Sequence, residues 1–558
     1  MPKSRLLISA IPLLFLAVFF LYPLWCIFAL AGSGGLTAIL GDRYYLRVIG
    51  FSAWLGVAST ALTLVAALPG AYVFARVQFR GKTLLRALAT VPFVLPTVVV
   101  AAAFGALLGP RGLANTLLQT VFGGHQPLIQ IDQAIWLVLA AHVFYNYSIV
   151  LRIVGGFWAG LDTRLEQAAA VLGANRWRVF REVTLPLLLP AIGAAALLVF
   201  IFCFASFGIV LILGGARMAT VEVEIYRQTA QFLRLDIAAA LALVQMLATL
   251  AMTLLYTRLQ SRATVTLAAR ATAANQRPPR TLAQHVFVAI NIMFLLLLIG
   301  TPLVALALRS VTAADGTPTL QFYRLLNEAS GSLFFVAPSV AVRNSLVFAL
   351  ATVVLSMLVG VPAAYLLAVQ GLGFRGQGSG GKGTILNFVF STFDALFTLP
   401  LGTSAVTLGL GYIVAFGPWG TLGSPLMVPV AHTLLAFPFV VRGLLPALRA
   451  LDPRMREAAQ VLGARPWRVL REVDLPLLAP ALLAGAIYAF TVSLGDFGAV
   501  LLLGQADYPT VPFVIYRLLG RPGSTNYGQA MALCTVMMLV SASCFVLLER
   551  ARPAGSEL

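Results

Sequence analysis

The chain has 558 residues, of which 60% are hydrophobic and only 10% are charged. Because soluble globular proteins carry roughly 25% charged residues, this composition excludes an ordinary soluble domain. The net charge of +19 would suit a nucleic-acid partner, but the basic residues cluster between apolar runs without interleaved aromatic side chains. We therefore expect no nucleic-acid partner and interpret the charge as cytoplasmic loops that orient membrane spans.

Apolar runs of about 20 residues, long enough to cross a bilayer as helices, recur along the whole chain. We predict spans near residues 7–31, 49–75, 86–108, 134–157, 187–213, 236–257, 283–308, 341–369, 385–415, 425–447, 478–503 and 528–548. A transmembrane barrel would instead show short alternating segments. The predicted fold class is an all-α polytopic membrane protein with about 12 transmembrane helices, beginning with an uncleaved span rather than a signal peptide.

Basic residues lie before the first span, after the second and fourth spans, and again at the matching places of the second half. Placing all of them in the cytoplasm satisfies the positive-inside rule and leaves both termini cytoplasmic. Residues 258–282 are small, polar and proline-containing, as in a linker. They separate a first predicted six-helix unit, 1–257, from a second, 283–558.

The two units are copies of one another. Residues 161–227 align with 451–517 at a constant offset of 290 and without a gap, and about half of the positions are identical. The same offset pairs His142 with His432. Because an even number of spans separates the copies, both face the same side and form parallel repeats about an axis normal to the membrane. Such a pair can enclose one pathway at its interface.

The repeat contains an unusual polar segment, "EQAAAVLGANRWRVFREVTLPLLLP" at 166–190 and "REAAQVLGARPWRVLREVDLPLLAP" at 456–480. We predict a helix that ends at Gly173 in the left-handed conformation, then a second short helix that Pro186 terminates. One alternative is an amphipathic elbow lying on anionic lipid. The paired alanines and the glycine turn, kept at one spacing in both copies, favour a docking surface for a closely approaching partner.

This segment resembles the cytoplasmic EAA loop of binding-protein-dependent ABC importer permeases, and the resemblance covers essentially the whole chain. It implies the type I ABC importer permease fold in a bacterial inner membrane. It also implies two ATP-binding cassette ATPase subunits, seated on coupling loops near 161–186 and 451–476, and a periplasmic substrate-binding protein. The coupling residues that it implies are Glu166, Gln167, Ala168, Ala169, Gly173, Arg178, Glu457, Ala458, Ala459, Gly463 and Arg468. Gln167 departs from the family's glutamate, which Glu457 retains.

Among fused permeases, "CFASFGIVLILGG", "TVEVEIYR", "SLGDFGAVLLLG" and "TVPFVIYRLLG" are most similar to the thiamine and thiamine pyrophosphate group, and next to ferric-iron permeases. The resemblance implies import of thiamine or its phosphate esters from periplasm to cytoplasm. Ferric iron or a polyamine-type cation is the alternative cargo. An ion-coupled secondary transporter is the alternative of another class, and it would need buried acid–base pairs along several spans.

No enzymatic chemistry is expected of this chain. "GQGSGGKGT" at 376–384 approaches a phosphate-binding loop, but Gly383 stands where Ser or Thr should hold magnesium. ATP hydrolysis would then belong to partner subunits, with no catalytic residue, cofactor or metal site in this chain. We expect His142 and His432 to hydrogen-bond between helices, and the four cysteines to act as small hydrophobic residues.

The substrate pathway is predicted where "FASFG" and "SLGDFG" interrupt matching spans, because interrupted helices in two repeats indicate a binding site. In the alignment of the two repeats Asp496 corresponds to Ser206, and Glu222 and Glu224 correspond to Pro512 and Val514. These acids, with the phenylalanines 204, 207 and 497, would favour a cationic substrate. The alternatives are a helix-capping role for Asp496 and a solvated loop for the glutamates. The candidate pathway residues are Ser206, Phe207, Glu222, Glu224, Asp496 and Phe497.

Overall fold

The computed structural model describes residues 3–110, 112–123, 135–215, 218–264, 276–328, 337–372, 396–504 and 507–551. Apart from two isolated bridges, the regular structure of these residues is helical, as expected where a bilayer requires each segment to satisfy its own backbone hydrogen bonds. The phosphate-loop-like stretch 376–384 and residues 265–275 of the linker lie outside the described residues.

The helices of the first half are α1 (Lys3–Leu16), α2 (Tyr22–Leu30), α3 (Leu36–Gly41), α4 (Arg43–Arg76), α5 (Lys82–Val94), α6 (Thr97–Leu108), α7 (Leu113–Phe122), α8 (Ile135–Gly160), α9 (Thr163–Val171), α10 (Arg176–Val179), α11 (Leu185–Phe204), α12 (Gly208–Leu213), α13 (Val221–Ala230) and α14 (Leu235–Thr264). Those of the second half are α15 (Leu282–Ser310), α16 (Gln321–Arg324), α17 (Pro338–Leu372), α19 (Ala405–Phe416), α20 (Met427–Ala450), α21 (Pro453–Val461), α22 (Pro466–Val469), α23 (Leu475–Gly495), α24 (Gly498–Leu503), α25 (Val511–Leu519) and α26 (Ser524–Ala551).

Eleven helices in the described part of the chain are long and apolar enough to cross a membrane, and each overlaps a predicted span. The remaining prediction, 385–415, lies partly outside the described residues, and its described end belongs to the shorter apolar helix Ala405–Trp419. The predicted span 86–108 is broken in two, since α5 ends at Val94 and α6 begins at Thr97. Leu95 is extended there because the residue before a proline disfavours the helical conformation.

The first spanning helix of each half packs against the other half. Leu16 and Phe20, at the start of the chain, belong to a hydrophobic core otherwise built from second-half residues, and α1 and α2 contact α17 and α19. Conversely, α15 contacts α4, α5 and α6, and Leu295 and Ile299 lie in the larger hydrophobic core, which holds most of the buried residues of the first half together with some of the second. The two repeats are therefore interlocked by exchanged helices, although they are consecutive in sequence.

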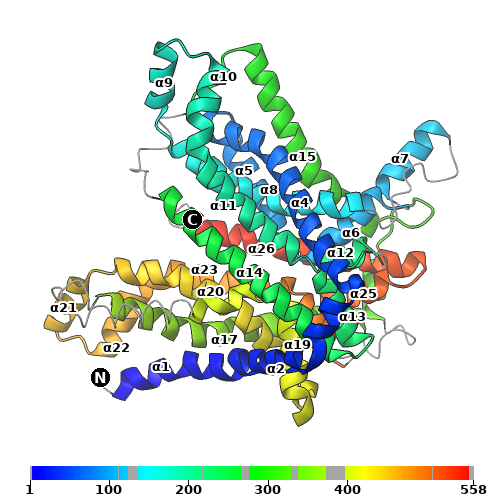
Figure 1. The fold of residues 1–558 in the computed structure, drawn as a ribbon, viewed down its shortest axis with the longest axis vertical. Helices are drawn as coiled ribbons and strands as arrows, with labels where there is room; N and C mark the ends of the chain where they lie inside the picture. The colour runs from blue at the N-terminus through cyan, green and yellow to red at the C-terminus, as the bar shows by residue number, and fades with distance from the viewer. Residues whose placement is uncertain are drawn as a thin grey trace.

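Both halves interrupt the same span at the same place. Helix α11 ends at Phe204 and α12 begins at Gly208, while α23 ends at Gly495 and α24 begins at Gly498. Near these breaks α13, α19 and α24 contact one another across the two halves. The pairs α9–α10 and α21–α22 lie at widely separated corners of the molecule (Figure 1). The halves thus join around the interrupted spans and diverge toward these two pairs of short helices.

Candidate translocation cavity and coupling brackets

The polar repeat forms a bent helical segment in each half, which we call the first bracket (residues 162–184) and the second bracket (residues 452–474). In the first bracket the Asp162 carboxylate accepts a hydrogen bond from the Arg164 N–H, 2.9 Å away, and caps α9. Gly173 has φ +87°, and its N–H donates to the Ala170 carbonyl at 3.0 Å. The predicted glycine turn is present, because a left-handed residue closes the open carbonyls of a helix end.

The second bracket repeats this geometry. The Asp452 carboxylate accepts from the Arg454 N–H at 3.0 Å, Gly463 has φ +83°, and its N–H donates to the Gln460 carbonyl at 2.9 Å. Two sequences that are only partly identical thus adopt one local structure, since the capping acid and the left-handed glycine occupy the same positions.

The prediction that Pro186 terminates the second short helix is wrong. The helix runs from Arg176 through a π-helical turn, Phe180–Thr184, directly into α11. The Leu185 N–H reaches back five residues to the Phe180 carbonyl, and Pro186 then lies in the first turn of α11. Because the helix is continuous there, the proline ring is accommodated by the wider π-helical turn that precedes it, where hydrogen bonds reach back five residues instead of four. The π-helical turn Leu470–Asp474 does the same in the second half, so each bracket is continuous with a spanning helix.

Large apolar side chains project from the tips of both brackets. Val171 and Leu172 are 87% and 88% exposed, and their counterparts Val461 and Leu462 are also 87% and 88% exposed. Trp177 and Trp467 are similarly exposed. Contiguous exposed apolar side chains rimmed by charge mark an interaction surface, and this surface occurs twice. Among the predicted coupling residues, Gln167, Ala168, Glu457 and Ala458 are exposed with it, whereas Ala169, Glu166 and Ala459 are half-buried.

The two brackets are held by different ion pairs. Glu166 accepts from the Arg76 guanidinium of α4 at 2.9 Å and from the Thr184 hydroxyl at 3.0 Å. At the equivalent position of the second bracket, Arg456 donates to Asp474, 2.7 Å away. Arg178 and Arg468 instead form exposed ion pairs with Glu182 and Glu472. Glu166 thus faces its own protein, while Gln167 lies on the exposed side.

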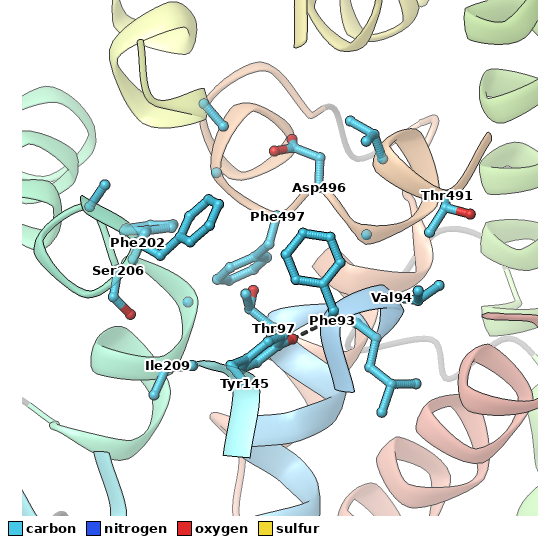
Figure 2. A pocket seen from close by; sticks show the side chains of 18 of the residues that line it. Phe93, Val94, Thr97, Tyr145, Phe202, Ser206, Ile209, Thr491, Asp496 and Phe497 are labelled. Atoms are coloured by element: carbon cyan, nitrogen blue, oxygen red, sulfur yellow. Dashed lines mark hydrogen bonds between the residues drawn. The ribbon is translucent and has the colours of Figure 1, made fainter. Parts of the chain in front are cut away.

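A cavity of about 440 Å³ lies between the halves where the spans are interrupted. Figure 2 shows side chains reaching it from α5 and α6, from α8, from the α11–α12 break and from the α23–α24 break. Its aromatic lining residues are Phe93, Tyr145, Phe202, Phe207, Phe439, Tyr488, Phe497 and Phe545. Its polar lining residues are Thr97, His142, Asn146, Ser206, Glu222, Ser404, Thr491 and Asp496. Five of the six predicted pathway residues line this one cavity, and Glu224 does not. The five are Ser206, Phe207, Glu222, Asp496 and Phe497.

Two buried histidines hold the interrupted spans in place. His142 contacts the Ser59 hydroxyl through Nδ1 at 2.7 Å and the Ser206 hydroxyl through Nε2 at 2.9 Å. His432 contacts Ser493 through Nδ1 at 2.8 Å and Asp496 through Nε2 at 3.2 Å. Both histidines therefore hydrogen-bond between helices, as expected, and their Nε2 atoms meet the residues that differ between the halves.

Asp496 serves the broken helix and the cavity together. Its Oδ2 accepts from the N–H groups of Ala499 and Val500, at 3.1 and 3.3 Å, so it caps α24. The same residue lines the cavity, as Figure 2 shows. The capping alternative and the pathway hypothesis are therefore compatible.

The two glutamates of α13 are buried, not solvated, and they differ in their surroundings. Glu224 accepts from the Tyr44 hydroxyl at 2.9 Å and from the Gln228 amide at 2.7 Å, and it does not line the cavity. Glu222 lines the cavity. One of its oxygens accepts from Gln245, and the other makes no hydrogen bond in the described part of the chain. Burial raises the pKa of the Glu222 carboxyl to about 7, with nearby Ser404 and Gln245 opposing that shift.

An aromatic cluster joins the halves beside the cavity. Phe207 stacks on Phe497, its counterpart in the repeat, with ring centroids 5.5 Å apart. Tyr226 packs against Phe207, and its counterpart Tyr516 packs against Phe497. Phe204, which we expected to contribute a ring to the pathway, instead stacks on Phe200 and does not line the cavity.

Sequence reasoning missed most of the aromatic wall. Phe93 and Tyr145 come from α5 and α8, and Phe439 and Tyr488 from α20 and α23. In an apolar span such residues look like lipid-facing or core side chains, and only Phe207 and Phe497 stand at matching positions of the repeat. The interruption of α5 and α6 before Pro96 was the available signal, because broken helices mark a pathway.

The sequence model of one family, described as "Binding-protein-dependent transport system inner membrane component", matches residues 67–265 and 339–551. The chain belongs to this family. It is a multi-pass inner-membrane permease of an ABC importer, and the double match confirms the fused repeat. Such a component works with an ATPase and with a substrate-binding protein.

Three curated relatives each cover more than nine-tenths of this permease. The thiamine transport system permease protein ThiP of Salmonella typhimurium is 29% identical, covering 93% of this chain and 91% of the relative. That of Brucella abortus (strain 2308) is 27% identical, covering 100% and 97%. The ferric transport system permease protein FbpB of Actinobacillus pleuropneumoniae is 26% identical, covering 97% and 77%. The resemblance predicted from the sequence is confirmed. The thiamine and ferric permeases are almost equally similar to this chain, so sequence identity does not distinguish the two substrates.

Proposed function

We propose that this permease imports thiamine or its phosphate esters, carrying them from the periplasm to the cytoplasm. The observation that supports this most is the cavity, where Glu222 and Asp496 stand among aromatic rings and no Lys or Arg belongs to the described lining. The thiazolium of thiamine is a flat organic cation. Acidic groups and aromatic faces recognise such a cation by charge and by cation–π attraction.

Ferric iron is the competing cargo, because ferric permeases are also similar to the chain. A hard metal cation is bound by several oxygen ligands placed around it. The described residues gather no group of three or more His, Cys, Asp and Glu side chains that could hold a metal ion. A wall dominated by carbon surfaces suits an organic cation better than a bare metal ion.

The brackets are the surfaces on which two ATPase subunits dock. Each bracket presents Leu172 or Leu462 at its tip and continues without a break into a helix that lines the cavity. Movement of a docked subunit is therefore transmitted to α11 and α23. In this arrangement the brackets and both termini are cytoplasmic, and the substrate-binding protein meets the opposite face.

Docking is tested by placing a charge on the exposed tip. Leu172→Glu and Leu462→Glu should each reduce co-purification of the ATPase, with the greatest loss when both are present, because a charge cannot enter an apolar groove without a partner. Met455 is an exposed apolar residue of the second bracket that lies in the first turn of α21, before the tip, so Met455→Glu is a matched control for Leu462→Glu. Unchanged ATPase recovery with both tips altered would contradict the assignment.

The cargo is tested in a bacterium that cannot synthesise thiamine and lacks its own importer. The chain is expressed with the ATPase and binding protein of its system, and uptake of labelled thiamine and of labelled ferric iron is measured in parallel. We expect growth on nanomolar thiamine and thiamine uptake that needs all three components. Iron uptake without thiamine uptake would refute the proposal.

A further inference from the structure

Arg309, at the far end of α15, is a half-buried arginine without an acidic partner among the described residues. One of its Nη atoms donates to the Thr116 hydroxyl of α7 at 2.6 Å, and its Nε is buried and makes no hydrogen bond in this part of the chain. Arg76, which is also largely buried, is neutralised by Glu166 instead. A guanidinium carries five N–H donors, and burying its charge without a counter-charge is costly. The remaining donors of Arg309 therefore need an anion from outside the described residues.

The acid that follows α15 most closely does not supply that counter-charge. Asp315 accepts hydrogen bonds from the N–H and the hydroxyl of Thr317, at 3.0 and 2.7 Å. The ion pairs of the described residues include none to Arg309. The positive charge is thus left uncompensated at the place where α15 meets α7.

The length of α15 places this arginine at the membrane surface. The helix has 29 residues, Leu282–Ser310. At 1.5 Å per residue it is roughly 43 Å long, whereas the hydrocarbon core is about 30 Å thick. The segment "GPRG" at 109–112, just before α7, aligns with "GPWG" at 417–420 in the second repeat. Trp419 of the latter is 67% exposed, and tryptophan is enriched at the headgroup level. Arg309 and the start of α7 therefore lie in the headgroup layer.

Helix α7 has the pattern of a helix that lies in that layer. At 3.6 residues per turn its polar residues share one half of the circumference, and these are Asn115, Thr116, Gln119 and Thr120. The other half is apolar and includes Leu117, Val121 and Phe122, which are 58%, 74% and 71% exposed. The helix projects at the edge of the molecule (Figure 1). Such a helix lies in the plane of the interface with its apolar half among the acyl chains, which leaves Thr116 on the side of the headgroups.

We propose that Arg309 and α7 form a binding site for a phospholipid in the periplasmic leaflet of the membrane. The guanidinium binds the phosphate of the headgroup, and the apolar half of α7 packs against the acyl chains. A phosphate can accept two parallel hydrogen bonds from a guanidinium, and an amphiphile satisfies both the uncompensated cation and the exposed apolar helix. The bound lipid would fasten the end of the exchanged helix α15 to α7 of the first half.

This site goes beyond the proposed function and does not depend on the cargo. Only the choice of leaflet rests on the proposed orientation. The Arg277 N–H, just before α15, donates to the carbonyl of Arg76 at 3.0 Å, and Arg76 also holds the first bracket. Helix α15 therefore begins on the side of the brackets, and Arg309 lies at its opposite end.

The test is phospholipid binding to the purified full-length permease, measured by native mass spectrometry. Delipidated protein is titrated with phosphatidylglycerol, with phosphatidylethanolamine and with a galactolipid that has the same acyl chains but no phosphate. Inorganic phosphate is the fourth ligand, because it has the charge without the chains. We expect the first phospholipid to bind at least about tenfold more tightly than the galactolipid, and inorganic phosphate not to displace it. Displacement by inorganic phosphate, or equally tight binding of the galactolipid, would overturn the proposal.

Matched variants locate the site. Arg309→Gln should weaken binding of the first phospholipid about tenfold, the effect of losing one charge-assisted hydrogen bond. Arg324→Gln changes an exposed arginine of α16 and should leave this binding unchanged. Val121→Gln should also weaken it, and because Val121 is exposed this variant decides if Arg309→Gln does not fold. Unchanged phospholipid binding in Arg309→Gln or, where that variant does not fold, in Val121→Gln would refute the site.

Two further outcomes separate this site from other roles. If Arg309→Gln reduces co-purification of the substrate-binding protein while phospholipid binding stays the same, Arg309 contacts a protein partner and the proposal is wrong. Failure of thiamine uptake in cells would refute the proposed function and leave the lipid measurements untouched, so the two proposals fail separately.

Discussion

Glu166 and Arg456 occupy equivalent positions in the two brackets but carry opposite charges, and a different element neutralises each of them. Arg76 of α4 pairs with Glu166 at 2.9 Å, and Asp474 within the second bracket pairs with Arg456 at 2.7 Å. The first bracket is therefore tied to a neighbouring spanning helix, and the second is tied to itself. Two docked ATPase subunits would therefore act on brackets that have the same shape but are anchored by different ion pairs.

Arg76→Gln should weaken coupling in the first half more than any change to the exposed pair Arg178–Glu182. Arg76 is largely buried, and a loss of about 1.4 kcal/mol, modest for a buried pair, lowers the correctly held population about tenfold. We expect ATP hydrolysis to persist and uptake per ATP to fall several-fold in reconstituted liposomes.

Glu182→Gln is the control for that variant, because exposed pairs contribute only about 0–1 kcal/mol. Joint replacement Arg76→Glu with Glu166→Arg should recover part of the loss. Normal transport per ATP in Arg76→Gln would show that the pair does not anchor the bracket.

Alanine at Gly173 or Gly463 should distort the turn in its bracket. Both glycines are left-handed, and an L-residue there costs about 1–2 kcal/mol. We expect weaker recovery of the ATPase in co-purification for either variant. Gly156 has open space around it and no left-handed φ, so Gly156→Ala serves as control and should match the unaltered protein. Full ATPase recovery with both bracket glycines replaced would argue against a strict turn geometry.

Phe207→Ala should weaken the contact between the two halves beside the cavity, because it removes the ring that stacks on Phe497. Stacked rings contribute about 0.5–1.5 kcal/mol beyond their buried area. The population of the conformation in which the halves meet at this stack should therefore fall by up to about tenfold. The measurement is ATP hydrolysis in the absence of substrate and binding protein, which we expect to rise. Phe204→Ala removes a ring that stacks outside the cavity, and it should not raise this basal rate. Equal rates for the two variants would dissociate the stack from closure.

His432→Ala should destabilise the protein more than His142→Ala. The first change leaves the buried carboxyl of Asp496 without its imidazole partner, which costs about 3 kcal/mol for a broken buried pair. The second leaves only hydroxyl groups unpaired, at about 1 kcal/mol. The unfolding temperatures of both variants, measured in the same detergent, give the ranking. A larger decrease in unfolding temperature for His142→Ala than for His432→Ala would contradict the prediction.

Several features were predictable from residues alone because they depend on local chemistry. Apolar runs predict spans, since a bilayer core admits only helices and barrels. The 290-residue offset predicts parallel repeats, and glycines at 173 and 463 predict left-handed turns. The prediction that a helix ends at Pro186 was wrong, because a π-helical turn accommodates the proline ring and the helix continues.

The sequence by itself thus determined the class of protein, its repeat and its brackets, because each follows from neighbouring residues or from self-similarity. Only the tertiary structure decided that α1 and α15 are exchanged between the cores, and that Glu222 faces the cavity while Glu224 does not. Residues two apart on a helix point in nearly opposite directions. Which direction leads to the cavity is set by how α13 packs against α4, α14 and α19, and contacts between such distant segments leave no local pattern.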